Sequence, residues 1–154
     1  MSRGQGRLLG IDYGTVRIGF AVCDRDRIIA SPLETYTRRS SELDGLHYLA
    51  LIQREEIKGL LLGLPVHTNG REGQKAQEAR TFGKWLQELT QLPLIYWDER
   101  FTTVEAETAL WNAGLTHKKR KERRDRVAAQ ILLAGYLEAG CPPEVEIKAM
   151  DAEE

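Results

Sequence analysis

Acidic residues from three distant parts of the chain have the sequence context of a catalytic or metal-binding site. Asp12 directly follows the apolar run 8–11 (LLGI), so a carboxylate is expected at the end of a buried strand. An isolated charge there is costly to desolvate unless a cation, a metal ion or hydrogen bonds receive it. Asp98 and Glu99 end a later strand-like run, and Asp125 opens an apolar helical pattern. Our working hypothesis is that these acids converge at one sheet edge.

The direction of Asp125 follows from helical spacing. Ala128, Ala129 and Leu132 lie three, four and seven residues after it, and therefore on the same face of a helix. That apolar face must be buried. Asp125 is therefore predicted in the first turn of the helix, pointing toward the sheet, and the two alanines are small enough to let the helix come close.

Converging carboxylates are typical ligands of hard divalent cations such as Mg²⁺, which keep open positions for water and phosphate oxygens. Two such ions about 3.5–4 Å apart activate a water molecule and stabilise the leaving oxygen in phosphodiester cleavage. Each acid also has a structural alternative. Asp12 could accept hydrogen bonds from the backbone amides of a turn. Asp98 or Glu99 could stabilise the N-terminus of the next helix. Asp125 could be an acid in the first turn of its helix or a partner for nearby arginines.

Hydrophobic periodicity and turn signals predict the elements that must position these acids. Strands are expected over 7–12, 17–24, 27–32, 58–64 and 94–97, and helices over about 42–56, 72–90, 102–112 and 124–139. Short connections make the first three strands an antiparallel meander. The prediction is an α/β fold, a five-stranded mixed sheet with helices on both faces, whose sites usually lie at the carboxyl ends of adjacent strands.

The side of each helix that faces the core is predicted from the same spacing. The first helix carries Leu43, Leu46, Leu49 and Ala50 on one side, and the second is expected to bury Ala76, Ala79, Phe82, Leu86 and Leu89. Of the three tryptophans, Trp85 and Trp97 are expected in the core, whereas Trp111 could stack on bases.

Length and composition are those of one globular domain. The 154 residues carry a net charge of −1, so no overall basic field indicates nucleic acid. We expect a single domain over 1–143 and an acidic tail over 144–154. Cys23 and Cys141 form neither a disulfide framework nor a zinc site. The start of the chain lacks the apolar core of a signal peptide and no run is long enough for a membrane span, so a cytoplasmic protein without membrane contact is expected.

The stretch 116–126 (THKKRKERRDR) holds seven Lys or Arg residues among its last ten. Such a run is often a solvated loop and helix start, but its place beside a candidate active site favours contacts with the phosphate backbone, which position the substrate without reading sequence. The candidate phosphate contacts are Arg17, Arg100, Lys118, Lys119, Arg120, Lys121, Arg123 and Arg124. The loop 65–71 could close over substrate, with His67 a weaker candidate as proton donor.

Four segments, in this order, resemble the YqgF/RuvX family of RNase H-like nucleases, which are related in fold to the RuvC Holliday junction resolvases. They are 10–24 (GIDYGTVRIGFAVCD), 63–73 (GLPVHTNGREG), 98–107 (DERFTTVEAE) and 125–137 (DRVAAQILLAGYL). The resemblance covers nearly the whole chain. It implies an RNase H-like fold and catalytic acids at Asp12, at Asp98 or Glu99, with Glu99 preferred, and at Asp125.

The resemblance implies a metal-dependent nuclease in which Asp12, Glu99 and Asp125 hold two Mg²⁺ or Mn²⁺ ions. In the resolvase relatives an acid ends the fourth strand, whereas here that place carries 63–65 (GLP), so the fifth strand must supply the second acid. The implied function is 5′-end processing of pre-16S rRNA. The implied partner is structured RNA or branched DNA, and a resolvase-like DNA endonuclease remains the alternative.

Two other classes of function fit parts of the sequence. The stretch 10–15 (GIDYGT) also resembles the first phosphate loop of the actin and sugar-kinase ATPases, which need two such domains around a nucleotide. A non-catalytic RNA-binding or transcription-associated factor could keep the same fold. Metal-dependent cleavage that is lost on Asp12→Asn would separate a nuclease from both.

Overall fold

The computed structural model describes residues 5–65, 73–99 and 116–143, and every structural statement below refers to these parts of the chain. Four predictions fall outside them: the helix over 102–112, the loop residue His67, the phosphate contact Arg100 and the acidic tail over 144–154. Trp111 also lies outside the described residues.

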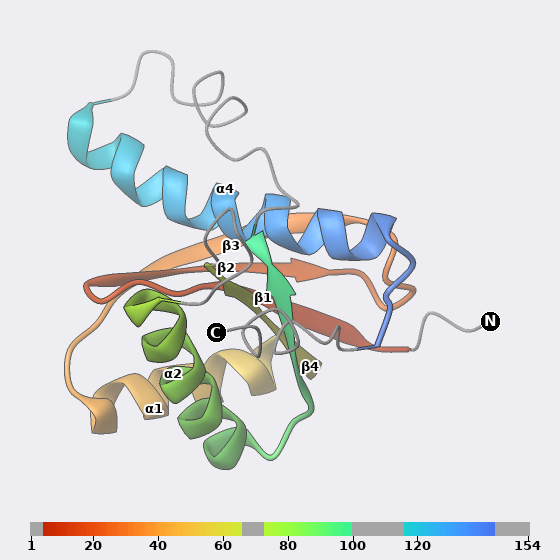
Figure 1. Cartoon of the computed structure of the whole chain (residues 1–154), viewed down its shortest axis with the longest axis horizontal. Coiled ribbons are helices and arrows are strands. Elements are labelled where there is room, and N and C mark those ends of the chain that lie inside the picture. Colours follow the sequence, from red (N-terminus) through yellow and green to blue (C-terminus); the bar gives the residue numbers. More distant parts are fainter. Residues whose placement is uncertain (1–4, 66–72, 100–115, 144–154) are drawn as a thin grey trace.

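The described strands form one mixed five-stranded sheet in the order β3-β2-β1-β4-β5 (Figure 1). Its strands are β1 (Arg7–Asp12), β2 (Arg17–Cys23), β3 (Ala30–Thr37), β4 (Ile57–Leu64) and β5 (Leu94–Asp98). The first three pair antiparallel, and β4 pairs parallel with both β1 and β5. The predicted α/β architecture with an antiparallel meander is therefore confirmed.

The third strand begins later than the sequence predicted, at Ala30 and not at residue 27. Asp24 Oδ1 accepts the backbone N–H groups of Ile28 and Ile29 at 2.7 and 2.8 Å, and Arg27 has a left-handed φ of 57°. These interactions hold 24–29 as a turn. Ile28 and Ile29 are apolar and β-branched, a composition typical of strands, but both are more than 60% exposed.

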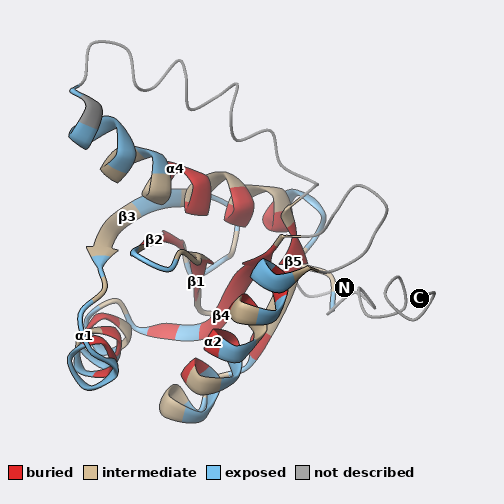
Figure 2. Ribbon diagram, turned by 60° about the vertical axis from the view of Figure 1, so that its left-hand side comes forward, coloured by how far each residue is buried: buried red, intermediate tan, exposed pale blue. Residues whose placement is uncertain are grey.

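In the described parts of the chain, three helices cover the sheet on its two faces (Figures 1 and 2). Helices α1 (Ser41–Arg54) and α2 (Gln74–Thr90) lie on one face, and α4 (His117–Glu138) crosses the other. Helices on both faces were predicted. None of the helices within 5–65, 73–99 and 116–143 is long and apolar enough to cross a lipid bilayer.

Helix α1 buries a different side from the one that its leucines indicated. Leu43 and Leu46 are 49% and 67% exposed, whereas Tyr48 and Leu51 are buried. Asp44 is buried too, because it accepts the Tyr36 hydroxyl at 2.7 Å and a backbone N–H at 2.9 Å. Hydrogen bonds satisfy the carboxylate, so the helix can turn this side inward and leave the leucines outside.

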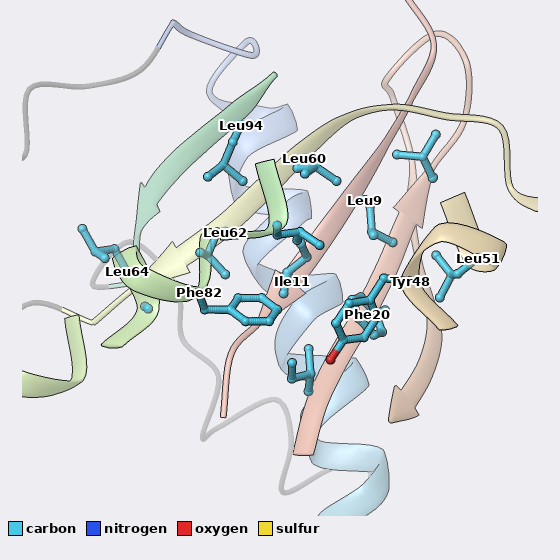
Figure 3. Packing of buried hydrophobic residues seen from close by; sticks show 14 of the residues in the cluster. Leu9, Ile11, Phe20, Tyr48, Leu51, Leu60, Leu62, Leu64, Phe82 and Leu94 are labelled. Atoms are coloured by element: carbon cyan, nitrogen blue, oxygen red, sulfur yellow. The ribbon is translucent and has the colours of Figure 1, made fainter. Parts of the chain in front are cut away.

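Side-chain alternation in the central strands divides the core into two layers. Leu9 and Ile11 of β1 point toward α1 and α2, where they pack with residues of β2, β4, α1 and α2 such as Phe20, Tyr48, Leu62 and Phe82 (Figure 3). Leu8, which precedes Leu9, points toward α4 on the opposite face. The same alternation decides the face on which each acid at the strand ends lies.

Helix α4 begins at His117 and not near residue 124, because the Thr116 side chain caps it by accepting the Lys119 N–H at 3.3 Å. The basic stretch is therefore helical, and the prediction that Asp125 lies in the first turn is wrong. The later turns pack through Ala129, Leu133 and their neighbours onto the sheet, as the apolar spacing predicted.

The closest approach of α4 to the sheet is at Gly19. A Cβ atom placed there would overlap the backbone carbonyl of Asp125, and one placed at Gly10 would come within 3.0 Å of the Leu133 Cβ atom. The Thr35 hydroxyl also donates to the backbone carbonyl of Glu122. Two glycines thus set the depth at which α4, and Asp125 with it, lies on the sheet.

We predict that Gly19→Ala lowers the free energy of unfolding by about 2–3 kcal/mol, because α4 must move away from β2. Gly45→Ala, on the buried side of α1, is the matched control. Its Cβ would meet other side chains only at 3.5 Å or more, so it should raise stability by about 0.5–1 kcal/mol through helix propensity. Urea unfolding of both variants measures this. Equal effects would contradict the close approach.

Candidate active site

Two of the predicted acids meet above the carboxyl ends of the parallel strands. Asp12 ends β1 and shares the α4 face with Leu8 and Gly10. Glu99 directly follows β5, and its side chain hydrogen-bonds with that of Asp12. Since β4 lies between β1 and β5, the two carboxyl groups meet over the end of that middle strand.

Gly63 of β4 makes this contact possible. A Cβ atom at Gly63 would lie 2.9 Å from Oε1 and 3.1 Å from Cγ of Glu99, which is tighter than side chains tolerate. Strands two positions apart are separated by about 9–10 Å, so Glu99 can reach Asp12 only across the place where a side chain at 63 would stand. The sequence analysis noted that the fourth strand lacks an acid, and the structure shows Glu99 lying over that position.

The structure also separates the two neighbouring candidates at the end of β5. Asp98 is 2% exposed and pairs in register with Leu64. Alternation with Trp97, which packs on the α4 side, directs Asp98 toward the α2 side of the sheet. Glu99, and not Asp98, therefore contacts Asp12, and the role of Glu99 as a catalytic acid stays a prediction.

Asp125 lies on the underside of α4, in the third turn of the helix. Its Oδ2 accepts Nε of Arg17 at 2.8 Å, and the two side chains are 19% and 30% exposed. Asp125 thus points toward the sheet, as predicted. It also pairs with an arginine, which was the alternative to a metal-binding role in the sequence analysis. Arg17 had been a candidate phosphate contact, but in this structure its guanidinium binds Asp125.

The charges of the three acids act on one another. Burial, followed by repulsion from Glu99 and from Asp125, raises the pKa of Asp12 well above its usual value, and Arg124 offsets only part of this rise. Burial also raises the pKa of Glu99, whereas its hydrogen bond with Asp12 and the positive charge of Lys75 lower it. Two negative charges on this buried pair are therefore unfavourable, and binding of a proton or another cation would reduce their repulsion.

The geometry gives a partial fit to a metal site. Within 5–65, 73–99 and 116–143, no group of three or more His, Cys, Asp or Glu side chains is close enough to hold an ion. Asp12 and Glu99 are in contact, whereas Asp125 is turned to Arg17. The donor set has the hard oxygen chemistry that Mg²⁺ and Mn²⁺ prefer, and its third member is within electrostatic reach of the pair.

The basic stretch forms the first two turns of α4, next to Asp125. Most of its side chains are exposed, namely Lys118, Lys119, Arg120, Lys121 and Arg124, while Arg123 is half-buried (Figure 2). Positive charges at a helix N-terminus oppose the helix dipole, so helix stability does not account for this composition. The stretch is a positively charged surface that leads up to Asp125, and the charge of Arg124 acts on Asp12.

The sequence and the fold both match known proteins. A model of the RuvX family, described as Holliday junction resolvase, matches residues 6–139. The chain belongs to the RuvX family. The resemblance drawn from the four sequence segments is therefore confirmed.

Curated RuvX relatives match this chain over most of its length. A protein of Rhodopirellula baltica is 48% identical over 134 residues, which cover 87% of this chain and 78% of the relative. One from Ruegeria pomeroyi is 45% identical and covers 85% of each. Both carry the name "Putative pre-16S rRNA nuclease".

Solved structures confirm the RNase H-like fold. RuvC of Thermus thermophilus in complex with a Holliday junction substrate superposes with a TM-score of 0.59, at 16% identity, and covers 91% of this chain and 99% of that one. Another structure of the same RuvC gives a TM-score of 0.56. At this identity the likeness concerns the fold alone.

We predict that Asp12→Asn stabilises the protein at neutral pH. Because the pKa of Asp12 is raised by folding, the folded state binds the proton more tightly, and stability falls as pH rises from the unfolded-state value of about 3.9 through the folded one. The variant lacks this loss. Its free energy of unfolding should exceed that of the wild type by about 1 kcal/mol at pH 7 and by much less at pH 4.

Urea unfolding at pH 4 to 8 tests this, with Asp26→Asn in the exposed turn after β2 as the matched control. The control should follow the wild type at each pH. A variant Asp12→Asn that is less stable than the wild type at pH 7 would show that Asp12 receives stabilising bonds as a turn residue, contrary to the electrostatic account.

Proposed function

We propose that the protein is a metal-dependent nuclease that hydrolyses phosphodiester bonds during 5′-end processing of pre-16S rRNA. The observation that carries the proposal is the contact of Asp12 with Glu99 at the carboxyl edge of the sheet, with Asp125 within electrostatic reach. The names of the RuvX relatives support the substrate. Under this proposal the Holliday junction is the second candidate substrate, favoured by the description of the family model.

In this proposal Asp12, Glu99 and Asp125 hold two Mg²⁺ or Mn²⁺ ions. Bound ions of this kind supply a Lewis acid for the phosphate and lower the pKa of the attacking water. The protein's own contribution is a desolvated carboxylate pair over Gly63, where burial raises the pKa of Asp12 and makes its negative charge unfavourable unless a cation compensates it.

Arg17 has a positioning role in the proposal. Its Nε atom holds Oδ2 of Asp125 at 2.8 Å and neutralises that carboxylate while no cation is bound. The basic turns of α4 would contact the phosphates on either side of the scissile bond, with Lys118, Lys119, Arg120, Lys121, Arg123 and Arg124 as candidates. Arg100, outside the described residues, stays a candidate from sequence alone.

We predict cleavage of a precursor RNA that carries the 5′ end of 16S rRNA in the presence of Mg²⁺ or Mn²⁺, and none in EDTA. Asp12→Asn should lower the rate on the order of a hundredfold or more while remaining folded, and Asp26→Asn should leave it unchanged. A gel assay against single-stranded RNA and a four-way DNA junction in parallel identifies the preferred substrate.

The outcomes of that assay separate the candidate functions. Faster cleavage of the junction would replace RNA processing with resolution. Binding of RNA without cleavage by the wild type would instead favour a non-catalytic RNA-binding factor. Equal cleavage by Asp12→Asn would exclude Asp12 from the reaction.

We also predict that about 10 mM Mg²⁺ raises the melting temperature of the wild type by about 2–4 °C, because an ion that binds only the folded state stabilises it. Asp12→Asn should start from a higher melting temperature and show little further rise. The shift of the melting temperature caused by Ca²⁺ serves as a comparison, because it measures stabilisation by a bound cation apart from catalysis. Equal Mg²⁺ shifts in both proteins would contradict the assignment of Asp12 as a ligand.

A further inference from the structure

A cleft with a volume of about 860 Å³ lies on the face of the sheet opposite α4, between the turn after β1, the segment before α1 and helix α2. Neither the acids nor the basic turns of α4 line it. Its walls include Tyr13, Arg38, Arg39, Gln77, Phe82 and Trp85. Clefts of about 300–1,000 Å³ usually bind small ligands or parts of larger ones.

Aromatic rings and one arginine form a rigid surface in this cleft. The rings of Tyr13 and Phe82 lie 4.8 Å apart, and the Arg38 guanidinium lies 5.2 and 5.7 Å from their centroids. Arg38 also donates to the Tyr13 hydroxyl at 3.0 Å and to the Gly14 carbonyl at 3.2 Å. Aromatic rings and fixed guanidinium planes are the surfaces on which unpaired bases stack.

One positively charged side chain of the cleft, that of Arg39, is available to a ligand. Asp44 is already matched by the Tyr36 hydroxyl, a backbone N–H and Arg38 at 4.0 Å. Glu78 accepts a hydrogen bond from Gln74 at 3.5 Å and keeps its negative charge. Among the residues described, the exposed Arg39 guanidinium makes no ion pair. It can therefore receive a phosphate, while Gln77 and Thr81 offer polar groups at the rim.

The cleft adjoins the candidate active site around the end of β1. Asp12 points to the α4 face and the next residue, Tyr13, to the cleft, about 3.8 Å away along the chain. The first turn of α2 serves both places, since Gln74 lines the cleft and the charge of Lys75 acts on Glu99. A nucleic acid strand at the acids can therefore pass over this edge into the cleft.

We infer that this cleft binds one or two unpaired nucleotides that flank the scissile phosphate, with bases on Tyr13, Arg38 and Trp85 and a phosphate at Arg39. This inference rests on the proposed function and adds a substrate requirement: a single-stranded segment next to the cleavage site. Stacking reads no sequence, so the cleft selects unpaired strands and not a particular base.

The first experiment measures binding alone. A fluorescein-labelled RNA tetranucleotide is titrated in EDTA against the wild type and two cleft variants, Arg39→Glu and Gln77→Trp, the latter filling the cleft. Arg25→Glu in an exposed turn and Gln87→Trp on an exposed part of α2 are the matched controls. Each cleft variant should weaken binding about tenfold or more, and neither control should change it by more than about twofold.

Amide and indole NMR signals then locate the bound RNA. Changes at Thr15, Thr81 and the Trp85 indole, which line the cleft, would agree with the inference. Changes confined to the basic turns of α4, equal binding by the cleft variants, or no binding of the tetranucleotide by the wild type would each overturn it.

Cleavage assays separate this inference from the proposed function. The cleft variants should cleave an RNA duplex with a two-nucleotide single-stranded extension about tenfold less efficiently than the wild type, whereas all the proteins should cleave a blunt duplex equally poorly. If the cleft variants cleave both as the wild type does, the nuclease stands and the cleft assignment fails. If the tetranucleotide binds in the cleft but no RNA is cleaved with Mg²⁺ or Mn²⁺, the nuclease fails and the binding site stands.

Discussion

The contact between the backbone of α4 and Gly19 of β2 determines how the two halves of the candidate site face each other. A side chain at 19 would overlap the carbonyl of Asp125, so the helix can lie this deep only where β2 has a glycine. That depth buries Ala129 and Leu133 against the sheet and brings the Asp125 carboxylate to Arg17. It also brings Arg124, at the end of the basic stretch, within electrostatic reach of Asp12. One steric condition thus places an acid, its counter-ion and a positive surface together.

The same region lowers the stability of the folded protein. Burial and mutual repulsion raise the pKa of Asp12, and lysines at the start of α4 oppose the helix dipole. Both features lower the stability of the folded chain, whereas the two apolar layers of the sheet support it. Local choices that oppose stability while the rest of the sequence favours one fold are expected at functional sites. This contrast is better evidence for a functional role of the acids than the position of any single acid, because ordinary turn and cap residues stabilise the fold.

Much of the fold could be predicted because apolar spacing determines it. The strands 7–12 and 58–64 and the helix 72–90 are close to β1, β4 and α2, and the buried side of α2 was predicted from Ala76, Ala79, Phe82 and Leu86. The errors have physical reasons. The start of α4 carries no apolar residue, so only its Thr116 cap marked it, and the buried side of α1 depends on hydrogen bonds to Asp44 from a distant strand.

The candidate site was predictable in part for the same reason. Acids at strand ends are visible in sequence, but the roles of Gly19 and Gly63 depend on side chains that approach from elsewhere in the chain. The cleft beside Tyr13 gave no sequence signal, because its walls come from three separate segments and Arg38 is one arginine among many. Only the packing of Arg38 on two rings distinguishes it from a surface cation.

Strand alternation links the two proposed binding surfaces. At the end of β1, consecutive residues point to opposite faces of the sheet, so Asp12 meets Glu99 on the α4 face while Tyr13 lines the cleft on the other. A strand that is held on both faces must bend sharply over this edge. A double helix is stiff over such a short distance, with a persistence length of about 150 base pairs for DNA, whereas an unpaired strand turns freely. Under the two proposals, the geometry of β1 favours a substrate that is single-stranded beside its cleavage site, and this argument applies to RNA and DNA alike.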